Sequence, residues 1–153
     1  MKSYLKAVQL KDMCFVAPDK GALTTASLYA QSFGARLVSC HKIRNAPNKI
    51  ASIEVTGTVK NTHAIIVDDI IDTGNTLYTV AQELKKQGAY LVRALCTHPV
   101  FSGYAYNHLA SSVLEEIIVT NTITLEQKNN KIKVVNIAPC IFEFIKKAAV
   151  DKY

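Results

Sequence analysis

The segment from Ala64 to Gln87 constrains the fold of this chain more than any other part of the sequence. It begins with the run Ala64 to Val67, which is apolar at every position and rich in β-branched residues. Such a strand is buried on both faces, which is typical of parallel sheets covered by helices. A short polar loop follows, and residues 76–87 then predict a helix that ends at Gly88. The order of strand, loop and helix predicts an α/β fold.

The same alternation extends along the rest of the chain. Short apolar runs predict five further strands, at Met13 to Ala17, Arg36 to Ser39, Leu91 to Cys96, Glu116 to Val119 and Ile132 to Ile137. Helices are predicted at Ala22 to Phe33, at Ser102 to Ser111 and near the C-terminus, where an apolar stripe is formed by Ile141, Phe144, Ile145 and Ala148. The 153 residues suit one domain. We therefore expect a single domain over residues 1–153, with a mainly parallel twisted sheet and helices on both faces.

The stretch from His41 to Ser52 interrupts this pattern. It is polar, contains Pro47 and three basic residues, and shows no hydrophobic periodicity. A segment of this kind is either a surface connection or a mobile active-site loop.

Charge and cysteine content limit the partners and the compartment. The net charge of +6 and the pI near 9.1 favour an anionic partner. The basic residues are scattered and do not alternate with aromatic residues, which argues against nucleic acid. The chain has no apolar run of membrane-spanning length and no signal-like start. Its four cysteines lie far apart without a Cys-x-x-Cys pair, which indicates reduced thiols in a cytoplasmic protein.

The loop after the Ala64 to Val67 strand carries the chemistry. Three of the six aspartates, Asp68, Asp69 and Asp72, lie within five residues there. Concentrating like charges costs stability unless cations or hydroxyl donors occupy the site. The following residues 73–76 are small or polar, so backbone N–H groups at a helix N-terminus can bind phosphate while carboxylates accept hydrogen bonds from sugar hydroxyls. The loop therefore predicts a site for a 5-phosphorylated ribose. A plain turn with helix capping is the alternative, but capping needs only one such residue.

Residues 67–77 resemble the phosphoribosyl-diphosphate motif shared by type I phosphoribosyltransferases and ribose-phosphate diphosphokinases. Four more segments resemble the diphosphokinases: residues 16–21 (VAPDKG), 41–44 (HKIR), 97–103 (THPVFSG) and 119–123 (VTNTI). The resemblance runs in order from Met13 to Val150 and covers only the C-terminal half of that enzyme. The family's N-terminal domain, which supplies much of the ATP pocket and a histidine that shares the magnesium, is absent from the resemblance.

The resemblance implies a type I phosphoribosyltransferase-like fold and a specific activity. The diphosphokinases transfer the β,γ-diphosphoryl group of ATP to the 1-hydroxyl of ribose 5-phosphate, giving phosphoribosyl diphosphate and AMP for nucleotide biosynthesis. By this resemblance Asp68 and Asp69 hold the ribose hydroxyls. The 5-phosphate would be bound by Asp72, Thr73, Gly74, Asn75 and Thr76.

A second loop is implied to bind the diphosphate through Asp19, Lys20, Gly21 and Ala22, with Asp19 as the ligand of a Mg²⁺ cofactor. An aspartate before a helix can also serve simply as its N-cap. The chain departs from the family at Ala22, which replaces a second glycine, and at Lys20, which adds a charge. A Cβ at position 22 would hinder close approach of the backbone to a ligand.

Lys42 and Arg44 are the implied catalytic residues, since the transferred diphosphoryl group needs nearby cations. A solvated basic loop is the alternative. His98 is expected to be a hydrogen-bonded structural residue rather than a base. For Phe101, Tyr104 and Tyr106 we expect core or interface packing rather than stacking on adenine.

Two rival functions remain open at this point. A non-catalytic ribose-phosphate-binding or regulatory subunit is favoured by Ala22, Asn75 and the missing nucleotide half. A type I phosphoribosyltransferase would need a base-recognising hood, for which no segment remains. For a member of the diphosphokinase family, catalytic or not, we expect a homo-oligomer or an assembly with an N-terminal-half domain.

Overall fold

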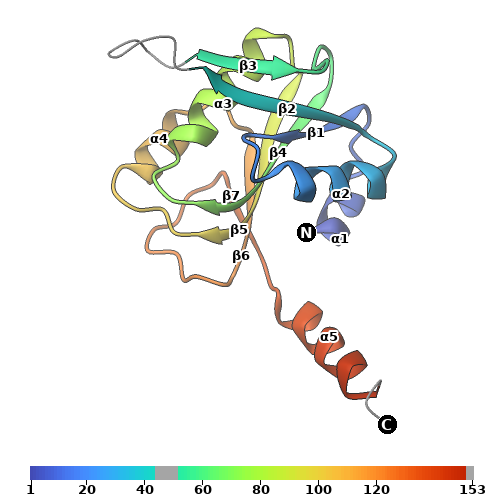
Figure 1. The fold of residues 1–153 in the computed structure, drawn as a ribbon. Helices are drawn as coiled ribbons and strands as arrows, with labels where there is room; N and C mark the ends of the chain where they lie inside the picture. The colour runs from blue at the N-terminus through green and yellow to red at the C-terminus, as the bar shows by residue number, and fades with distance from the viewer. Residues whose placement is uncertain (44–51, 151–153) are drawn as a thin grey trace.

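The computed structural model describes residues 1–43 and 52–150. Its strands are β1 (Met13–Ala17), β2 (Arg36–Ile43), β3 (Ser52–Thr56), β4 (His63–Ile71), β5 (Leu91–Pro99), β6 (Glu116–Thr120) and β7 (Ile132–Val135). Its helices are α1 (Lys2–Val8), α2 (Leu23–Phe33), α3 (Asn75–Lys86), α4 (Ala105–Ser111) and α5 (Ala138–Val150). The strands form one sheet in the order β3-β2-β1-β4-β5-β6-β7, in which β3 runs antiparallel to β2 and the other neighbours are parallel (Figure 1). This confirms the predicted α/β fold.

Helices cover both faces of the sheet, as the apolar strands predict. Ala64 and Ile66 of β4 belong to the core cluster that also contains the buried side chains of α3 and α4. Ile65 and Val67 belong to the second cluster, with the buried side chains of α1 and α2. All four are at most 2% exposed. Each fully buried isoleucine contributes about 1.5–3 kcal/mol, so both faces of this strand help to fix the position of the loop that follows it.

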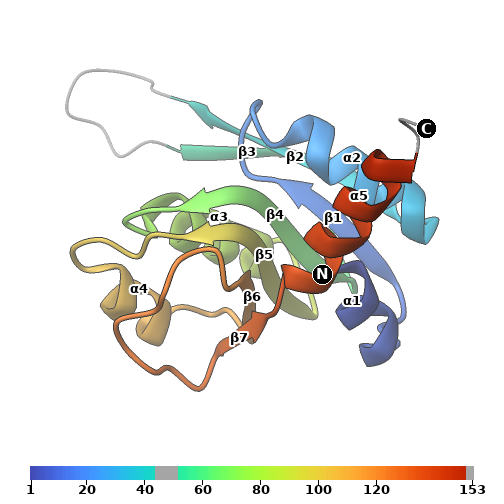
Figure 2. The ribbon, with the colours of Figure 1, turned by 90° about the horizontal axis from the view of Figure 1, so that it is seen from below.

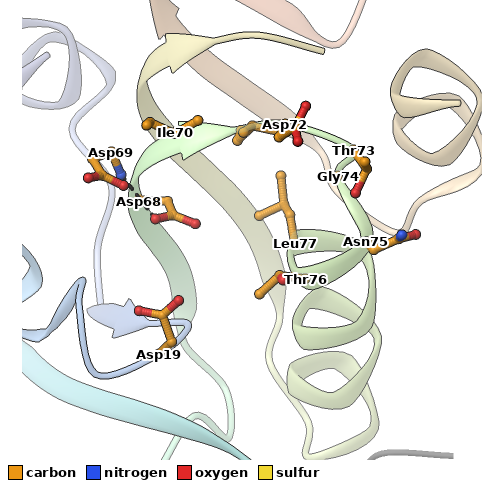
Figure 3. Close-up of a pocket in the computed structure, with 11 residues that line it drawn as sticks. Asp19, Asp68, Asp69, Ile70, Asp72, Thr73, Gly74, Asn75, Thr76 and Leu77 are labelled. Carbon is orange, nitrogen blue, oxygen red and sulfur yellow. Dashed lines mark hydrogen bonds between the residues drawn. The ribbon is translucent and has the colours of Figure 1, made fainter. Parts of the chain in front are cut away.

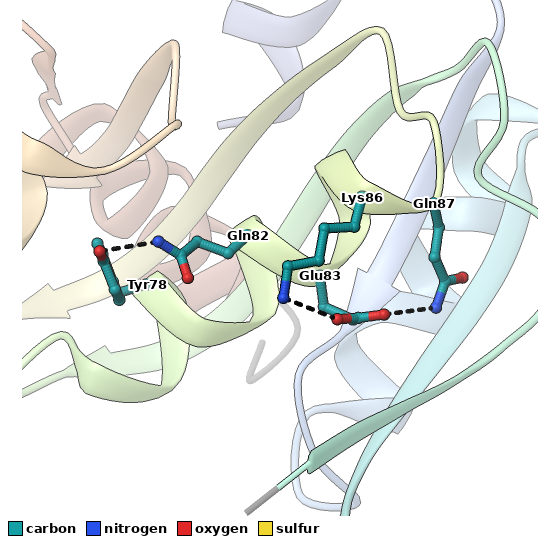
Figure 4. Close-up of polar contacts among 5 residues, drawn as sticks. All are labelled: Tyr78, Gln82, Glu83, Lys86 and Gln87. Atoms are coloured by element: carbon teal, nitrogen blue, oxygen red, sulfur yellow. Dashed lines mark hydrogen bonds and ion pairs between the residues drawn. The ribbon is translucent and has the colours of Figure 1, made fainter. Parts of the chain in front are cut away.

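Helix α3 is amphipathic along its whole length. Its buried side chains, Leu77, Val80, Ala81 and Leu84, recur at three- and four-residue spacing. The opposite face carries exposed polar pairs one turn apart (Figure 4): Gln82 donates to the Tyr78 hydroxyl at 2.8 Å and Gln87 donates to Glu83 at 3.1 Å. Glu83 also lies 3.7 Å from the Lys86 ammonium. Such surface pairs contribute only about 0.2–0.5 kcal/mol each, so burial of the apolar face holds α3 on the sheet.

Two elements were not predicted from the sequence. Helix α1 attaches to the core through Leu5, which is 1% exposed. Strand β3 alternates polar and apolar residues, and its Ile53 and Val55 pack against the core. At five residues, β3 is too short and too polar for its sequence to be distinguished from that of the preceding loop.

The expectation of an irregular segment over residues 41–52 is wrong at both of its ends. Strand β2 continues through Ile43, and its last three residues pair with Ser52, Ile53 and Glu54 of β3. Antiparallel pairing supplies the backbone hydrogen bonds that the apolar pattern alone did not indicate. The expected mobile loop now falls on residues 44–51, which lie outside the described residues, so its mobility remains a prediction. At the other end of the sheet, β7 ends at Val135 rather than at Ile137.

The predicted C-terminal helix is present as α5, but its apolar stripe does not pack on the domain. Helix α5 has thirteen residues, and Figure 1 shows it extending away from the sheet. In Figure 2, seen from below, it lies in front of the domain. Ile141 is 49% exposed and Phe144 is 74% exposed. None of the described helices is both long enough and apolar enough to span a membrane.

Candidate functional site

The candidate site lies where the order of the strands reverses. From β1 the chain passes through α2 to β2 on one side, whereas β4, on the other side of β1, leads through α3 to β5. Open α/β sheets bind ligands in the crevice at the carboxyl ends of such strands. A pocket of about 250 Å³ lies there, lined by Asp19 after β1 and by residues 68–77, which run from the end of β4 into the start of α3 (Figure 3). The structure thus brings together the two predicted loops, which are about fifty residues apart in the sequence.

The start of α3 provides the donors for an anion. Gly74 has φ 76°, a conformation that L side chains rarely adopt, and it turns the chain directly into the helix. Within the described residues, the backbone N–H groups of residues 73–76 donate to no protein acceptor. Free N–H groups and the positive end of the helix dipole both favour a phosphate at this point. The binding of a 5-phosphate by these residues stays a prediction.

Asp72 is held by the segment that leads into α4. The Ser102 hydroxyl donates to the Asp72 carboxylate, and the Ser102 N–H donates to the Asp72 carbonyl oxygen at 3.1 Å. The Phe101 N–H donates to the Ile71 carbonyl oxygen at 3.0 Å. The Asp72 carboxylate therefore supports the loop through Ser102 while it also lines the pocket, and its expected part in binding the 5-phosphate stays a prediction. Ser102 is a supporting residue that sequence reasoning missed, because only the resemblance of residues 97–103 marked its segment.

Asp68 and Asp69 line the pocket from within β4, which continues to Ile71, so the expectation that they lie in the loop after the strand is wrong. Burial raises the pKa of Asp68 to about 6, and the negative charges of Asp19 and Asp69 raise this pKa further. The Asp69 N–H donates to Asp68 Oδ1 at 3.0 Å, and this hydrogen bond acts to lower the pKa. The half-buried Asp68 and the exposed Asp69 thus repel each other next to a third carboxylate. Hydroxyl donors or a cation would relieve that repulsion, which is the property expected of a site for two sugar hydroxyls.

The Asp19 carboxylate holds the turn before α2 with one oxygen. The Ala22 N–H donates to Asp19 Oδ1 at 3.1 Å, but the N-cap of α2 is Ala22, so the alternative in which Asp19 is the N-cap is wrong. The other oxygen has no donor among the described residues, and the carboxylate lines the pocket. Ala22 is 7% exposed and belongs to the core with α2. Its methyl group therefore packs inward, so the expected obstruction by a Cβ at position 22 has no support in the structure.

Lys42 reaches the start of α3 from β2, which is separated from β4 by β1. Its ammonium donates to the Thr76 hydroxyl at 2.8 Å, although 34 residues separate the two. A second pocket, of about 520 Å³, is lined by Asp19, Lys20, Gly21, Cys40, His41 and Lys42. Asp19 lines both pockets, so the predicted diphosphate loop and catalytic lysine adjoin the predicted sugar-phosphate site. Arg44 lies outside the described residues.

The other side chains singled out from the sequence are mostly structural. His98 Nδ1 lies 3.1 Å from the Thr122 hydroxyl, which in turn donates to the Thr97 carbonyl oxygen at 2.8 Å, so the structural interpretation of His98 is confirmed. Phe101 and Tyr106 are buried and make an edge-to-face contact with ring centroids 5.3 Å apart. Tyr104 is exposed and does not belong to the core.

The carboxylates fit a shared metal ion better than a closed metal cage. In the described part of the chain, no three His, Cys, Asp or Glu side chains are grouped to hold a metal. Mg²⁺ in phosphoryl-transfer sites takes only one or two protein carboxylates and completes its shell with water and substrate phosphates. Asp19, with one unbonded oxygen beside the second pocket, matches that donor set.

The fold and the site define an α/β domain with a pocket at the reversal of strand order, the place where open α/β sheets bind ligands. Residues 16–152 match the family model described as "Phosphoribosyl synthetase-associated domain". The chain therefore belongs to that family.

Individual relatives agree with this assignment. The "Ribose-phosphate pyrophosphokinase" of Campylobacter jejuni is 40% identical over 144 residues, which are 94% of this chain and 47% of the relative. The crystal structure of "phosphoribosylpyrophosphate synthetase" from Mycobacterium smegmatis superposes with a TM-score of 0.80 at 35% identity, covering 92% of this chain and 46% of that one. An adenine phosphoribosyltransferase structure, at 19% identity, TM-score 0.60 and coverages of 77% and 74%, shares the fold alone. The chain spans about half the length of the pyrophosphokinases it matches.

Proposed function

We propose that this chain is the sugar-phosphate-binding half of a ribose-phosphate diphosphokinase (the same activity as pyrophosphokinase). The reaction transfers the β,γ-diphosphoryl group of ATP to the 1-hydroxyl of ribose 5-phosphate and releases AMP. The observation that carries the proposal is the hydrogen bond between Lys42 and Thr76, because it joins the candidate catalytic strand to the phosphate loop. Family membership over residues 16–152 supports it independently.

Ribose 5-phosphate would be bound at its two ends by one continuous segment. The backbone of residues 73–76 and the Thr73 and Thr76 hydroxyls bind the 5-phosphate, while Asp68 and Asp69 accept hydrogen bonds from the two ring hydroxyls. Charge-assisted hydrogen bonds of this kind are about twice as strong as neutral ones. The raised pKa of Asp68 supports this role, since a half-buried carboxylate gains most when donors reach it.

The transfer step rests on positioning and charge rather than on a general base. Lys42 stabilises the charge that moves with the diphosphoryl group, and Arg44 is proposed to assist it. Asp19, Lys20, Gly21 and Ala22 hold the diphosphate from the other side of the second pocket, with Asp19 binding Mg²⁺. When bound, Mg²⁺ would neutralise part of the negative charge of the phosphates. Held geometry and fixed charges account for most of the rate enhancement in phosphoryl-type transfer.

The nucleotide site requires a second protein region. This chain spans about half of its relatives, and α5 carries an apolar face that nothing in the described chain covers. That face is formed by residues 138, 141, 142, 145, 148 and 149, whereas Glu143, Lys146 and Lys147 lie opposite. An amphipathic helix is stable when its apolar face is buried. We assign this face to contact with an N-terminal-half domain, within one longer polypeptide or in a homo-oligomeric assembly.

A non-catalytic ribose-phosphate-binding subunit is the second candidate. The half-length match favours it, whereas the inward packing of Ala22 removes one of its arguments. ATP binding separates the two candidates, because only an enzyme requires it. Under either candidate the buried free thiols of Cys14, Cys40 and Cys96 suit a reducing, cytoplasmic compartment.

Calorimetric titration with ribose 5-phosphate tests the proposed site. The double variant Asp68→Asn/Asp69→Asn should lose about 2–4 kcal/mol of binding free energy, because charge-assisted hydrogen bonds to the sugar are removed. The single variant Asp12→Asn is the matched control, because it removes a carboxylate that lies before β1, at the opposite end of that strand from Asp19. Affinity of the double variant within twofold of wild type would rule out the sugar-binding role.

A further inference from the structure

His108 contacts the phosphate loop from outside the pocket. It lies on α4, and its Nδ1 is 3.1 Å from the carbonyl oxygen of Thr73. A carbonyl oxygen only accepts hydrogen bonds, so Nδ1 must carry the proton and donate it. None of the segments that resemble the diphosphokinases includes this residue, and it does not line the pocket.

The imidazole ring is held in place by neighbouring elements. It packs against Tyr78 of α3, with ring centroids 6.0 Å apart and planes inclined by 35°. Helix α4 also lies close to Gly74: a Cβ at that residue would be 3.8 Å from Leu109 Cδ2 and 3.9 Å from Ala105 Cα. The donor on His108 therefore has a fixed position relative to the loop.

This contact determines which way the Thr73–Gly74 peptide faces. No described peptide bond is cis, so the Thr73 carbonyl and the Gly74 N–H point in opposite directions. With the carbonyl bound to His108 behind the loop, the Gly74 N–H points into the pocket. A glycine at the second position makes a flip of this peptide inexpensive, because φ is free to change sign there. A flipped peptide would direct a carbonyl oxygen at the phosphate and repel it.

We propose that His108 is a positioning residue for the 5-phosphate: by binding the Thr73 carbonyl, it keeps the Gly74 N–H directed at the phosphate. The inference rests on the proposed function of the loop. It predicts that His108 affects the phosphate end of the ligand and leaves the sugar end unchanged.

Three variants of the full chain separate this role from a general packing role. His108→Leu removes the donor, and it should weaken ribose 5-phosphate and inorganic phosphate by about tenfold each, the usual effect of one hydrogen bond near a charge. His108→Asn should restore affinity to within about threefold of wild type, because its amide N–H lies near the position of Nδ1–H. Ser111→Ala is the control on α4, since its hydroxyl bonds only the carbonyl oxygens of Asn107 and His108.

Amide NMR provides a readout that loss of packing would not reproduce. Adding inorganic phosphate should shift the Gly74 amide resonance strongly in wild type and in His108→Asn, and weakly in His108→Leu. Equal phosphate affinity in wild type and His108→Leu would overturn the inference, as would failure of His108→Asn to restore either signal. If wild type binds neither ribose 5-phosphate nor phosphate, the proposed function fails as well. Normal wild-type binding with an unaffected His108→Leu variant would overturn the positioning role alone.

Discussion

The two ends of the candidate site are built differently. The sugar-phosphate end is a single strand, loop and helix, held from behind by Ser102 and His108. The proposed diphosphoryl end combines the loop after β1 with Lys42 on β2, which line one pocket, and we propose that a second region of protein completes it. The residues proposed to bind the ligand at the first end all lie within residues 68–76, although their supports come from residues 30 and 35 positions away. We propose that the second end needs a region of the relatives that these 153 residues do not match, so binding and catalysis should be separable for these residues.

Removing Lys42 should produce the largest effect that distinguishes the two ends. In the complete enzyme, Lys42→Ala should lower turnover by about 100- to 1,000-fold, because a fixed cation is lost where charge moves. Affinity for ribose 5-phosphate should fall by less than about fivefold, since only the exposed bond to Thr76 is lost. Steady-state kinetics and calorimetry on the same preparation measure both. If affinity for ribose 5-phosphate fell as much as turnover, Lys42 would act at the sugar-phosphate end and not at the diphosphoryl end.

A side chain at Gly74 should affect the sugar-phosphate end of the site. Gly74→Ala places a Cβ on a residue with φ 76°, which should cost about 1–2 kcal/mol of unfolding free energy. It should also weaken phosphate binding, because the loop must change its backbone angles. Gly103→Ala is the matched control: φ there is 56° and the space around it is open. Urea denaturation should show similar losses of stability for both variants. An equal loss of phosphate affinity in both would contradict the account.

The smallest expected effect is the dependence of stability on the Asp68 carboxyl group. Its pKa of about 6 in the folded chain exceeds the unfolded value of about 3.9, so the folded state binds more protons between these values. Stability contributed by the protonated form is therefore present below about pH 4 and lost as pH rises towards 6. Asp68→Asn should raise stability at pH 7 by about 1 kcal/mol, allowing for solvent screening of a half-exposed group, and by little at pH 4.

Urea denaturation between pH 4 and pH 7.5 measures this difference, with Asp12→Asn as the control for loss of a carboxylate. If Asp68→Asn raised the free energy of unfolding equally at every pH, or lowered it at pH 7, then ionisation of Asp68 would not destabilise the folded state.

The parts of the molecule that the sequence predicted well are those with dense local signals. The apolar run before Asp68 predicted a strand covered on both faces, and the glycine and small residues after it predicted the loop. The elements it missed, α1 and β3, are short and owe their structure to long-range contacts, through Leu5 to the core and through the pairing of β3 with β2.

Within the site, too, the sequence predicted the local segments but not the long-range contacts between them. The segment around Asp19 and the segment around Lys42 were each predicted, but only the fold shows that Lys42 reaches Thr76. Ser102 and His108 act on the loop through backbone and carboxylate contacts, which single side-chain identities do not indicate.

Separation of binding from catalysis is tested most directly by measuring AMP release from the purified chain with ATP, Mg²⁺ and a saturating concentration of ribose 5-phosphate. The account predicts negligible AMP, because the adenine and the nucleotide phosphates are not positioned. It also predicts AMP formation after addition of a separately produced N-terminal half, and a lower yield with Phe142→Ser on the apolar face of α5. Robust AMP formation by the chain alone, dependent on ribose 5-phosphate, would contradict the account.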